Sequence, residues 1–91
     1  MATEVFYETK KPSSTGTGRV LYIHKAWGFE PGQIVRFSAH PISRPNDVVN
    51  LYKKVCATGG GGMGIYIDRA WGFSDDEFIV FSISATDKVY L

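Results

Sequence analysis

The sequence predicts a mainly β fold in which two related units close into one small β-barrel. Runs of β-branched and aromatic residues alternate with turns rich in glycine and proline, which is the pattern of short strands. A segment of the chain also recurs 44 residues further on. A unit of about 40 residues is marginal alone. Folding two of them around one pseudo-twofold axis would hide the sheet edges in a closed barrel.

The repeat centres on the tetrapeptide Ala-Trp-Gly-Phe, found at 26–29 and again at 70–73. Between 22–38 and 66–82, eight of 17 positions are identical without a gap. Self-similarity at a fixed period indicates an internal repeat. We therefore expect a single domain made of two repeats, about 4–47 and 48–91.

Each unit is expected to contain strands, a glycine-rich loop and one short helical turn. The turns at 24–27 and 68–71 are too short for a standing helix, and Gly28 and Gly72 would end them in the left-handed conformation. Trp27 and Trp71 are expected to pack on the shared core. The predicted strands are Val5 to Thr9, Arg19 to Ile23, Ile34 to Ala39, Val48 to Val55, Gly64 to Ile67, Glu77 to Ser84 and Val89 to Leu91.

Composition favours a small folded protein over a tail or a membrane span. The 91 residues are 44% hydrophobic and 21% charged, which suits one globular domain. The single cysteine, Cys56, has no partner for an intrachain disulfide. Neither a signal sequence nor an apolar run long enough to cross a bilayer is visible. These features predict a cytoplasmic protein that does not enter a membrane.

Charge is unevenly distributed between the two units. The net charge is +1, which by itself does not favour binding to nucleic acid. Residues 1–44 carry six Lys and Arg against three Glu, for a net +3, whereas residues 45–91 carry four against six, for a net −2. A pair of lysines nevertheless precedes the glycine-rich loop in both units, at 10–11 and 53–54. We expect these two pairs to share one face of the protein.

The first unit resembles the AbrB-type swapped-hairpin family. That family carries a Gly-Arg-Val-x-Ile-Pro strand, a short helix, a Leu-Gly-Leu-x-Pro-Gly-Asp turn and an alternating Val-x-Phe strand. Here the corresponding segments read Gly-Arg-Val-Leu-Tyr-Ile at 18–23, Trp-Gly-Phe-Glu-Pro-Gly-Gln at 27–33 and Ile-Val-Arg-Phe at 34–37. The second unit fits more loosely through 65–67, 71–73 and 79–81, and 87–91 is similar to the family's closing strand. The family's proline is replaced by His24 and Asp68, and its helix is about three residues longer.

The resemblance implies binding to double-stranded DNA by a single-chain pseudo-dimer, in a small transcriptional regulator found with the nucleoid. Family members are homodimeric regulators or antitoxins, so two units in one chain would form the equivalent of that dimer. It leaves open whether two such chains pair further. Met63 stands where the arginine of the second unit is expected. The positions that match the family's DNA-contacting residues are Lys10, Lys11, Arg19, Lys25, Lys53, Lys54 and Arg69.

A second hypothesis is a protein-binding module, antitoxin-like or inhibitory, whose acidic second half docks on a basic partner. The near-zero net charge and Met63 favour it.

Other motifs predict neither catalysis nor a cofactor. The glycine runs at 15–18 and 58–62 lack the Lys-Ser or Lys-Thr of a nucleotide-binding loop, so we interpret them as hairpin tips. His24, His40 and Cys56 have no metal-ligand spacing, and no metal site is expected. The acidic run at 75–77 falls where the first unit has Pro-Gly-Gln, which predicts a turn. No nucleophile stands beside a base in both units, so we do not expect an enzyme.

Overall fold

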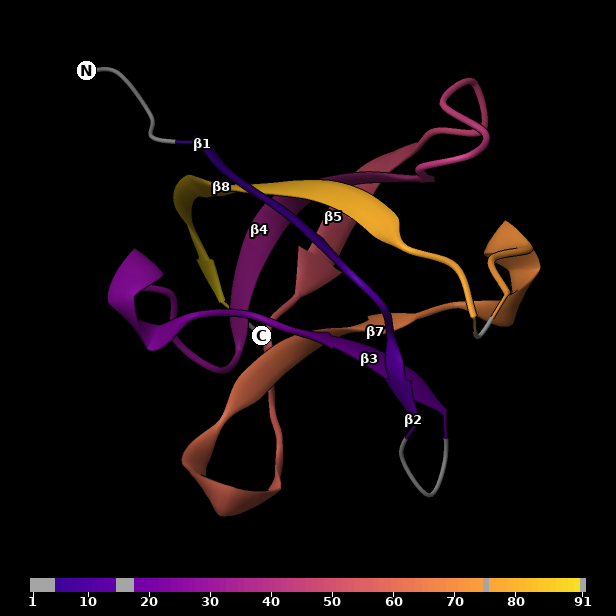
Figure 1. Ribbon diagram of the computed structural model, residues 1–91. Coiled ribbons are helices and arrows are strands. Elements are labelled where there is room, and N and C mark those ends of the chain that lie inside the picture. The colour runs from indigo at the N-terminus through magenta and orange to yellow at the C-terminus, as the bar shows by residue number, and fades with distance from the viewer. Residues whose placement is uncertain (1–4, 15–17, 75, 91) are drawn as a thin grey trace.

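The computed structural model describes residues 5–14, 18–74 and 76–90, with the backbone alone in 86–90. Its strands form two four-stranded antiparallel sheets, so the prediction of a mainly β fold is confirmed (Figure 1). The elements are β1 (Val5–Lys10), β2 (Ser13–Ser14), β3 (Arg19–Tyr22), η1 (Lys25–Trp27), β4 (Gln33–Pro41), β5 (Val49–Lys54), β6 (Cys56–Ala57), η2 (Gly59–Gly61), β7 (Met63–Ile67), η3 (Arg69–Trp71) and β8 (Ile79–Tyr90), where η denotes a 3-10 turn.

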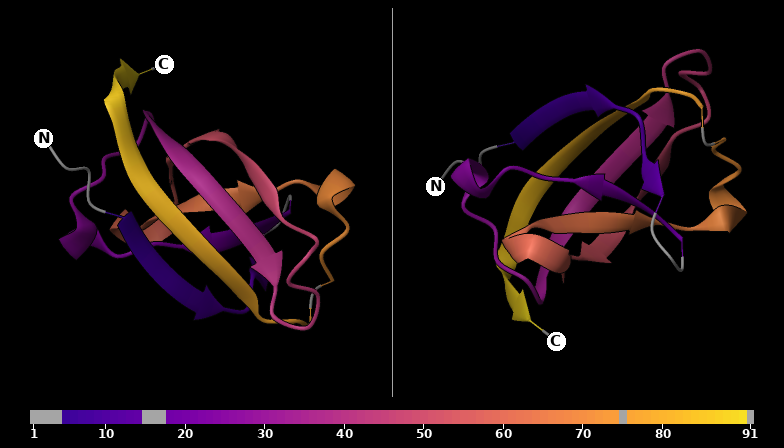
Figure 2. Two further views of the ribbon diagram at one scale, coloured as in Figure 1. Left: turned by 90° about the horizontal axis from the view of Figure 1, so that it is seen from above. Right: turned by 60° about the horizontal axis from the view of Figure 1, so that its bottom comes forward.

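The strand order differs from the order in the chain. Sheet A runs β1-β8-β4-β5 and sheet B runs β2-β3-β7-β6. Sheet A forms the upper layer in Figure 1 and is seen from outside in the left view of Figure 2. At the centre of each sheet, residues that match in the sequence repeat lie opposite each other: Ser38 pairs with Ser82, and Leu21 pairs with Ile65.

The edge strands of sheet A extend this correspondence upstream of the sequence match. Lys10 lies opposite Ile79, and Lys53 lies opposite Val35, the residue that matches Ile79 in the repeat. The two lysines therefore hold equivalent positions, separated by 43 residues rather than 44. The difference is one residue in the glycine-rich loop, which is longer in the second unit.

The structure does not contain the closed barrel that the sequence predicts. No ladder between the described strands joins sheet A to sheet B. The chain passes between the sheets four times, through η1 between β3 and β4, through η3 between β7 and β8, and at two short corners, between β1 and β2 and between β5 and β6. Pro12, which has no N–H for a ladder, lies at the first corner. At the second, buried Val55 donates to the carbonyl of Gln33 and accepts from Gly32, at 2.8 and 2.7 Å.

β8 also differs from the prediction, which had two separate strands, Glu77 to Ser84 and Val89 to Leu91. It runs without a break from Ile79 to Tyr90. Ala85 pairs with Val35, and Tyr90 pairs with Gln33. Residues 86–89 of β8 therefore lie opposite a single residue of β4, and the pairing of the two strands is irregular there. β2 and β6 have only two residues each, too few to leave a pattern in the sequence.

The core lies between the sheets and is built largely from matched pairs. Inward-facing residues alternate with outward-facing ones along β4, as a half-buried strand requires. The matched buried pairs are Leu21 with Ile65, Ile23 with Ile67, Phe29 with Phe73, Val35 with Ile79, Phe37 with Phe81 and Ala39 with Ile83.

The two tryptophans pack on this core, as predicted, at the ends of the sheets. Trp27 stacks on Phe6 with ring centroids 5.1 Å apart, and Trp71 stacks on Phe37 at 5.8 Å. Each is the last residue of a 3-10 turn, and a left-handed glycine follows it, Gly28 with φ 85° and Gly72 with φ 74°. A side chain at either glycine would be strained, so the sequence requires glycine there to bring the chain back over the core.

Gly64, in β7, leaves no room for a side chain, and this predicts the effect of a substitution on stability. A Cβ at Gly64 would lie 2.6 Å from Val20 Cγ2 and 2.7 Å from the carbonyl oxygen of Leu21. Overpacking of this kind costs about 1–3 kcal/mol. We expect Gly64→Ala to lower the Tm by at least about 4 °C in a thermal melt.

Gly59→Ala is the matched control, because nothing lies within 4 Å of its Cβ position. It should leave the Tm unchanged within about 2 °C. Equal melting temperatures for the two variants would contradict the packing of β3 against β7 described above.

Candidate nucleic-acid interface

The seven predicted DNA-contacting residues divide into those that hold the fold together and those that are exposed. Lys10 belongs to the first group. Its Nζ donates to the carbonyl oxygen of Tyr22 at 3.0 Å and lies 3.7 Å from the carboxylate of Glu8. Because Lys10 is on β1 of sheet A and Tyr22 is on β3 of sheet B, this side chain links the two sheets at their edge. His24 Nε2 lies 2.8 Å from the same carboxylate.

Arg19 and Lys53 are also engaged within the protein. A guanidinium N–H of Arg19 donates to the carbonyl oxygen of Phe73 at 2.7 Å, which ties β3 to the segment after η3. Lys53 Nζ lies 5.4 Å from the ring centroid of Trp71, in the geometry of a cation–π interaction. Lys53 is half-buried and covers the tryptophan at the edge of the core.

The side chain that matches Arg19 in the second unit is Met63, and it belongs to the core. Met63 is buried and packs in the hydrophobic cluster between the sheets. It therefore offers no surface to a phosphate. Arginine at one position and methionine at the other make the two ends of sheet B electrostatically different.

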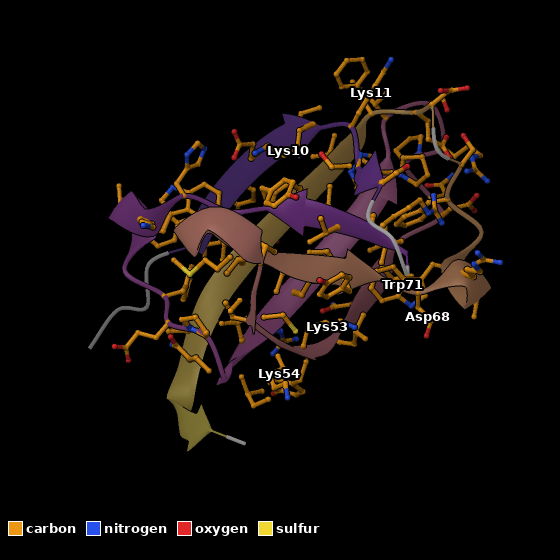
Figure 3. All side chains as sticks on the ribbon, turned by 90° about the horizontal axis from the view of Figure 1, so that it is seen from below. Lys10, Lys11, Lys53, Lys54, Asp68 and Trp71 are labelled. Atoms are coloured by element: carbon orange, nitrogen blue, oxygen red, sulfur yellow. The ribbon has the colours of Figure 1, made fainter. Side chains whose placement is uncertain are left out.

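The two lysine pairs do not come together. Lys10 and Lys11 are on the β1 edge of sheet A, whereas Lys53 and Lys54 are on the β5 edge, with two strands between them (Figure 3). The expectation of one shared lysine face is therefore wrong. β1 and β5 are equivalent strands of the two units, and they form opposite edges of sheet A. Their lysines are therefore on opposite edges as well.

Lys11 and Lys54 are exposed at these edges. Lys11 Nζ lies 5.2 Å from the ring centroid of Phe78, which is itself exposed. Lys54 makes no hydrogen bond through its side chain with the described part of the chain. The edge position of both lysines also suits the protection of sheet A against pairing with another strand.

Lys25 and Arg69 are matched exposed cations, Lys25 in η1 and Arg69 in η3. Neither forms a hydrogen bond or an ion pair through its side chain with a residue that the structure describes. Asp68, before the second turn, accepts a hydrogen bond from the backbone N–H of Ala70 at 2.9 Å. Its carboxylate is therefore engaged in capping the turn.

Lys25 lies beside the glycine-rich loop of the other unit. Its Nζ is 3.7 Å from the position that a Cβ would take at Gly61. Gly60 and Gly61 have φ of 76° and 83°, and the N–H of Thr58 donates to the carbonyl of Gly62 at 2.9 Å, which closes the loop. The matching tip at 15–17 lies outside the described residues.

Within the acidic run at 75–77, Glu77 binds the backbone of the residue just before the run. Glu77 accepts hydrogen bonds from the backbone N–H of Ser74 and from Arg44, each at 2.7 Å. The hydrogen bond from Ser74 has the largest effect and lowers the pKa of Glu77 from its ordinary value of 4.5. Desolvation raises the pKa by less than this, and Arg44 lowers it further. Arg44 also lies 3.4 Å from Asp47. Asp75 lies outside the described residues.

Sequence reasoning missed the link between Arg44 and Glu77, which are 33 residues apart and meet only in the folded chain. It also missed Arg36, an exposed cation in the middle of sheet A. The strand alternation would have identified Arg36, because Val35 and Phe37 on either side of it are buried.

Within the described residues, no group of three His, Cys, Asp or Glu side chains is placed to hold a metal ion. The Cys56 thiol is free and lies 3.6 Å from the carbonyl oxygen of Lys54. None of the described helical segments has the length and apolar character needed to span a bilayer.

Searches of protein-family models, curated proteins and solved structures find no match to this chain.

The lowered pKa of Glu77 predicts the pH dependence of stability. The contribution of this carboxylate is fully present above pH 4.5, the ordinary pKa, and is lost as the pH falls through the lowered pKa of the folded protein. We expect the Tm of the wild-type protein to fall between about pH 5 and about pH 3, and Glu77→Gln to show less of this fall.

Thermal melts across this pH range test the expectation, with Asp76→Asn as the control for loss of one exposed negative charge. An acid-induced fall that is equally steep for Glu77→Gln and the wild-type protein would contradict a stabilising role for Glu77.

Proposed function

We propose that the chain is a covalently linked pair of swapped-hairpin units that binds double-stranded DNA as a small cytoplasmic regulator. Three features support the proposal. The first unit resembles a DNA-binding family of that fold, the chain carries two copies of its central motif, and matched residues pair across the centre of both sheets. In this proposal the two units take the place of the two subunits of a dimer.

The observation that carries the proposal is the pair of matched, exposed cations Lys25 and Arg69. Their turns lie at opposite ends of the protein in Figure 1, η1 in magenta and η3 in orange. The longest extent of the protein is 34 Å. One turn of duplex DNA spans about 34–36 Å, so in this proposal the two cations contact phosphates that lie within about one helical turn of each other.

The remaining basic residues take different roles in this proposal. Lys11 and Lys54, exposed at the edges of sheet A, add to the positive potential that attracts a polyanion. Lys10, Arg19 and Lys53 keep the turns in place through their contacts with Tyr22, Phe73 and Trp71. Binding is then chiefly electrostatic and independent of base sequence, because phosphate contacts position a protein on the duplex without specifying bases.

Salt dependence of duplex binding tests this proposal. Each phosphate contact contributes about −0.9 to the slope of log K against log salt. We expect Lys25→Ala and Arg69→Ala each to weaken binding and to flatten the slope by about 1, and the double variant by about 2, in anisotropy titrations with a labelled duplex of about 20 base pairs.

Arg36→Ala removes one exposed positive charge from sheet A and is the control, with a smaller effect on duplex affinity than either turn variant. An unchanged slope for the double variant would contradict the assignment of Lys25 and Arg69 to phosphates.

A protein partner is a second candidate, and one surface feature favours it. Ile42 and Phe78 are both exposed and are joined by a backbone hydrogen bond of 2.9 Å from Ile42 N–H to the carbonyl of Phe78. Exposed Val48 follows Asp47 in the same region of the chain. Exposed apolar side chains that lie together are typical of a surface that binds a protein partner. This candidate predicts no measurable affinity for the duplex even at low salt, so the same titration separates the two.

A further inference from the structure

We propose that the outer face of sheet A binds single-stranded nucleic acid, with unpaired bases stacked on Tyr7 and Tyr52. This face is separate from the two turns assigned to duplex DNA, and the inference does not depend on that assignment. It follows from three properties of the face: exposed aromatic rings, small side chains between them and charge of one sign among the described side chains.

The register of sheet A defines the face. Residues directly opposite each other in neighbouring strands point to the same side of a sheet. One row across the sheet therefore consists of Tyr7, Ser82, Ser38 and Asn50, and the next consists of Val5, Ser84, Arg36 and Tyr52. The alternate residues, among them Phe37 and Phe81, point the other way into the core, so these two rows look outward.

The two tyrosines are the most exposed large hydrophobic side chains of the described residues. Tyr7 is 73% exposed and Tyr52 is 61% exposed. Neither ring packs against another aromatic ring of the described part of the chain. A tyrosine in a folded protein commonly buries much of its ring. Two tyrosine rings that are exposed on the face of a sheet are therefore available to stack with a planar ligand.

The spacing of the rings suits a chain of bases better than one small molecule. Tyr7 is on β1 and Tyr52 is on β5, the two edges of sheet A. They are separated by three strand spacings, or about 14 Å across the strands, and by two residues along them. Ser38 and Ser82 lie between them at the centre of the sheet. Small side chains there leave room above the sheet for bases and sugars that connect the two stacking points.

Charge favours a nucleic-acid strand over a protein surface. Arg36 lies in the same row as Tyr52, and Lys54 is exposed further along β5. The only acidic residue in the described side chains of the four strands is Glu8, which is on the inward-facing side of β1. Arg36 and Lys54 attract phosphates, and the tyrosine rings stack with bases of any sequence.

Bases must be unpaired to use this face. In a duplex the base faces are covered by their neighbours in the stack, and only the edges and the phosphates are accessible. A sheet face with two exposed stacking rings therefore prefers a single strand to a duplex. Single-strand binding by sheets of this kind combines a basic surface with aromatic rings.

Anisotropy titration with a labelled oligothymidine of about 12 nucleotides tests the proposal on the intact protein. We expect Tyr7→Ala and Tyr52→Ala each to weaken binding roughly 5- to 10-fold, which is the lower part of the range for loss of one stacked base. Tyr7→Phe and Tyr52→Phe should bind within about two-fold of wild type, because the ring and not the hydroxyl stacks. The matched control is Tyr22→Ala, which removes a 39% exposed tyrosine from sheet B and should not alter affinity.

An abasic oligonucleotide of the same length separates stacking from charge. Under the proposal it binds more weakly than oligothymidine, and the Tyr7→Ala change has no further effect on it. Equal affinity for the abasic and the normal strand would overturn the proposal, as would unchanged affinity in the double Tyr7→Ala, Tyr52→Ala variant. Circular dichroism of each variant establishes that it is folded before its affinity is compared.

The two faces are distinguished by crossing the variants with the two ligands. Lys25→Ala with Arg69→Ala should weaken the duplex complex and leave the affinity for oligothymidine within about three-fold, and the tyrosine variants should do the reverse. If the affinity for oligothymidine falls only in the Lys25→Ala, Arg69→Ala variant, the outer face of sheet A is not the binding site for the single strand. If the duplex fails to bind wild type while oligothymidine still depends on Tyr7 and Tyr52, the duplex proposal fails and this one stands.

Discussion

The two halves of the chain depend on each other because every strand pair in sheet A joins one half to the other. β1 pairs with β8, β8 with β4, and β4 with β5, and in each pair one strand comes from the first unit and one from the second. Neither half contains a partner for its own strands in this sheet. The core has the same dependence, since buried residues of the first unit have their matched counterparts in the second, as Phe37 does in Phe81. A unit of about 40 residues could not bury enough surface to fold alone.

This arrangement explains why cations that are equivalent in sequence do not act as one cluster. Strands that correspond across the centre of sheet A lie on opposite edges, which separates Lys10 from Lys53. Each then meets a different local environment: Lys10 finds Glu8 and a carbonyl oxygen, whereas Lys53 finds the ring of Trp71. The two units have a similar framework but differ in single side chains, which gives them different surfaces. Arg19 and Met63 are the clearest example, with one half-exposed and the other buried.

Much of the fold could be predicted from the sequence, because it depends on patterns of neighbouring residues. Alternation predicts β4, and a glycine after Ala-Trp predicts the left-handed ends of η1 and η3. The absence of a closed barrel could not be predicted, since it depends on where the chain changes sheets at Pro12 and Val55. The candidate site was predicted less well. Exposure of Lys25 and Arg69 follows from their turns. The contacts of Lys10 with Tyr22, of Arg19 with Phe73 and of Lys53 with Trp71, however, join residues at least 12 positions apart.

Native-state hydrogen exchange tests the mutual dependence of the two halves most directly. If the halves share one cooperative unit, the central amides of β4 and β8 around Ser38 and Ser82 open with one free energy, equal to that of global unfolding. Both strands should then lose protection together as denaturant is added. Amides of β8 that stay protected after those of β4 have exchanged, or the reverse, would contradict a joint core.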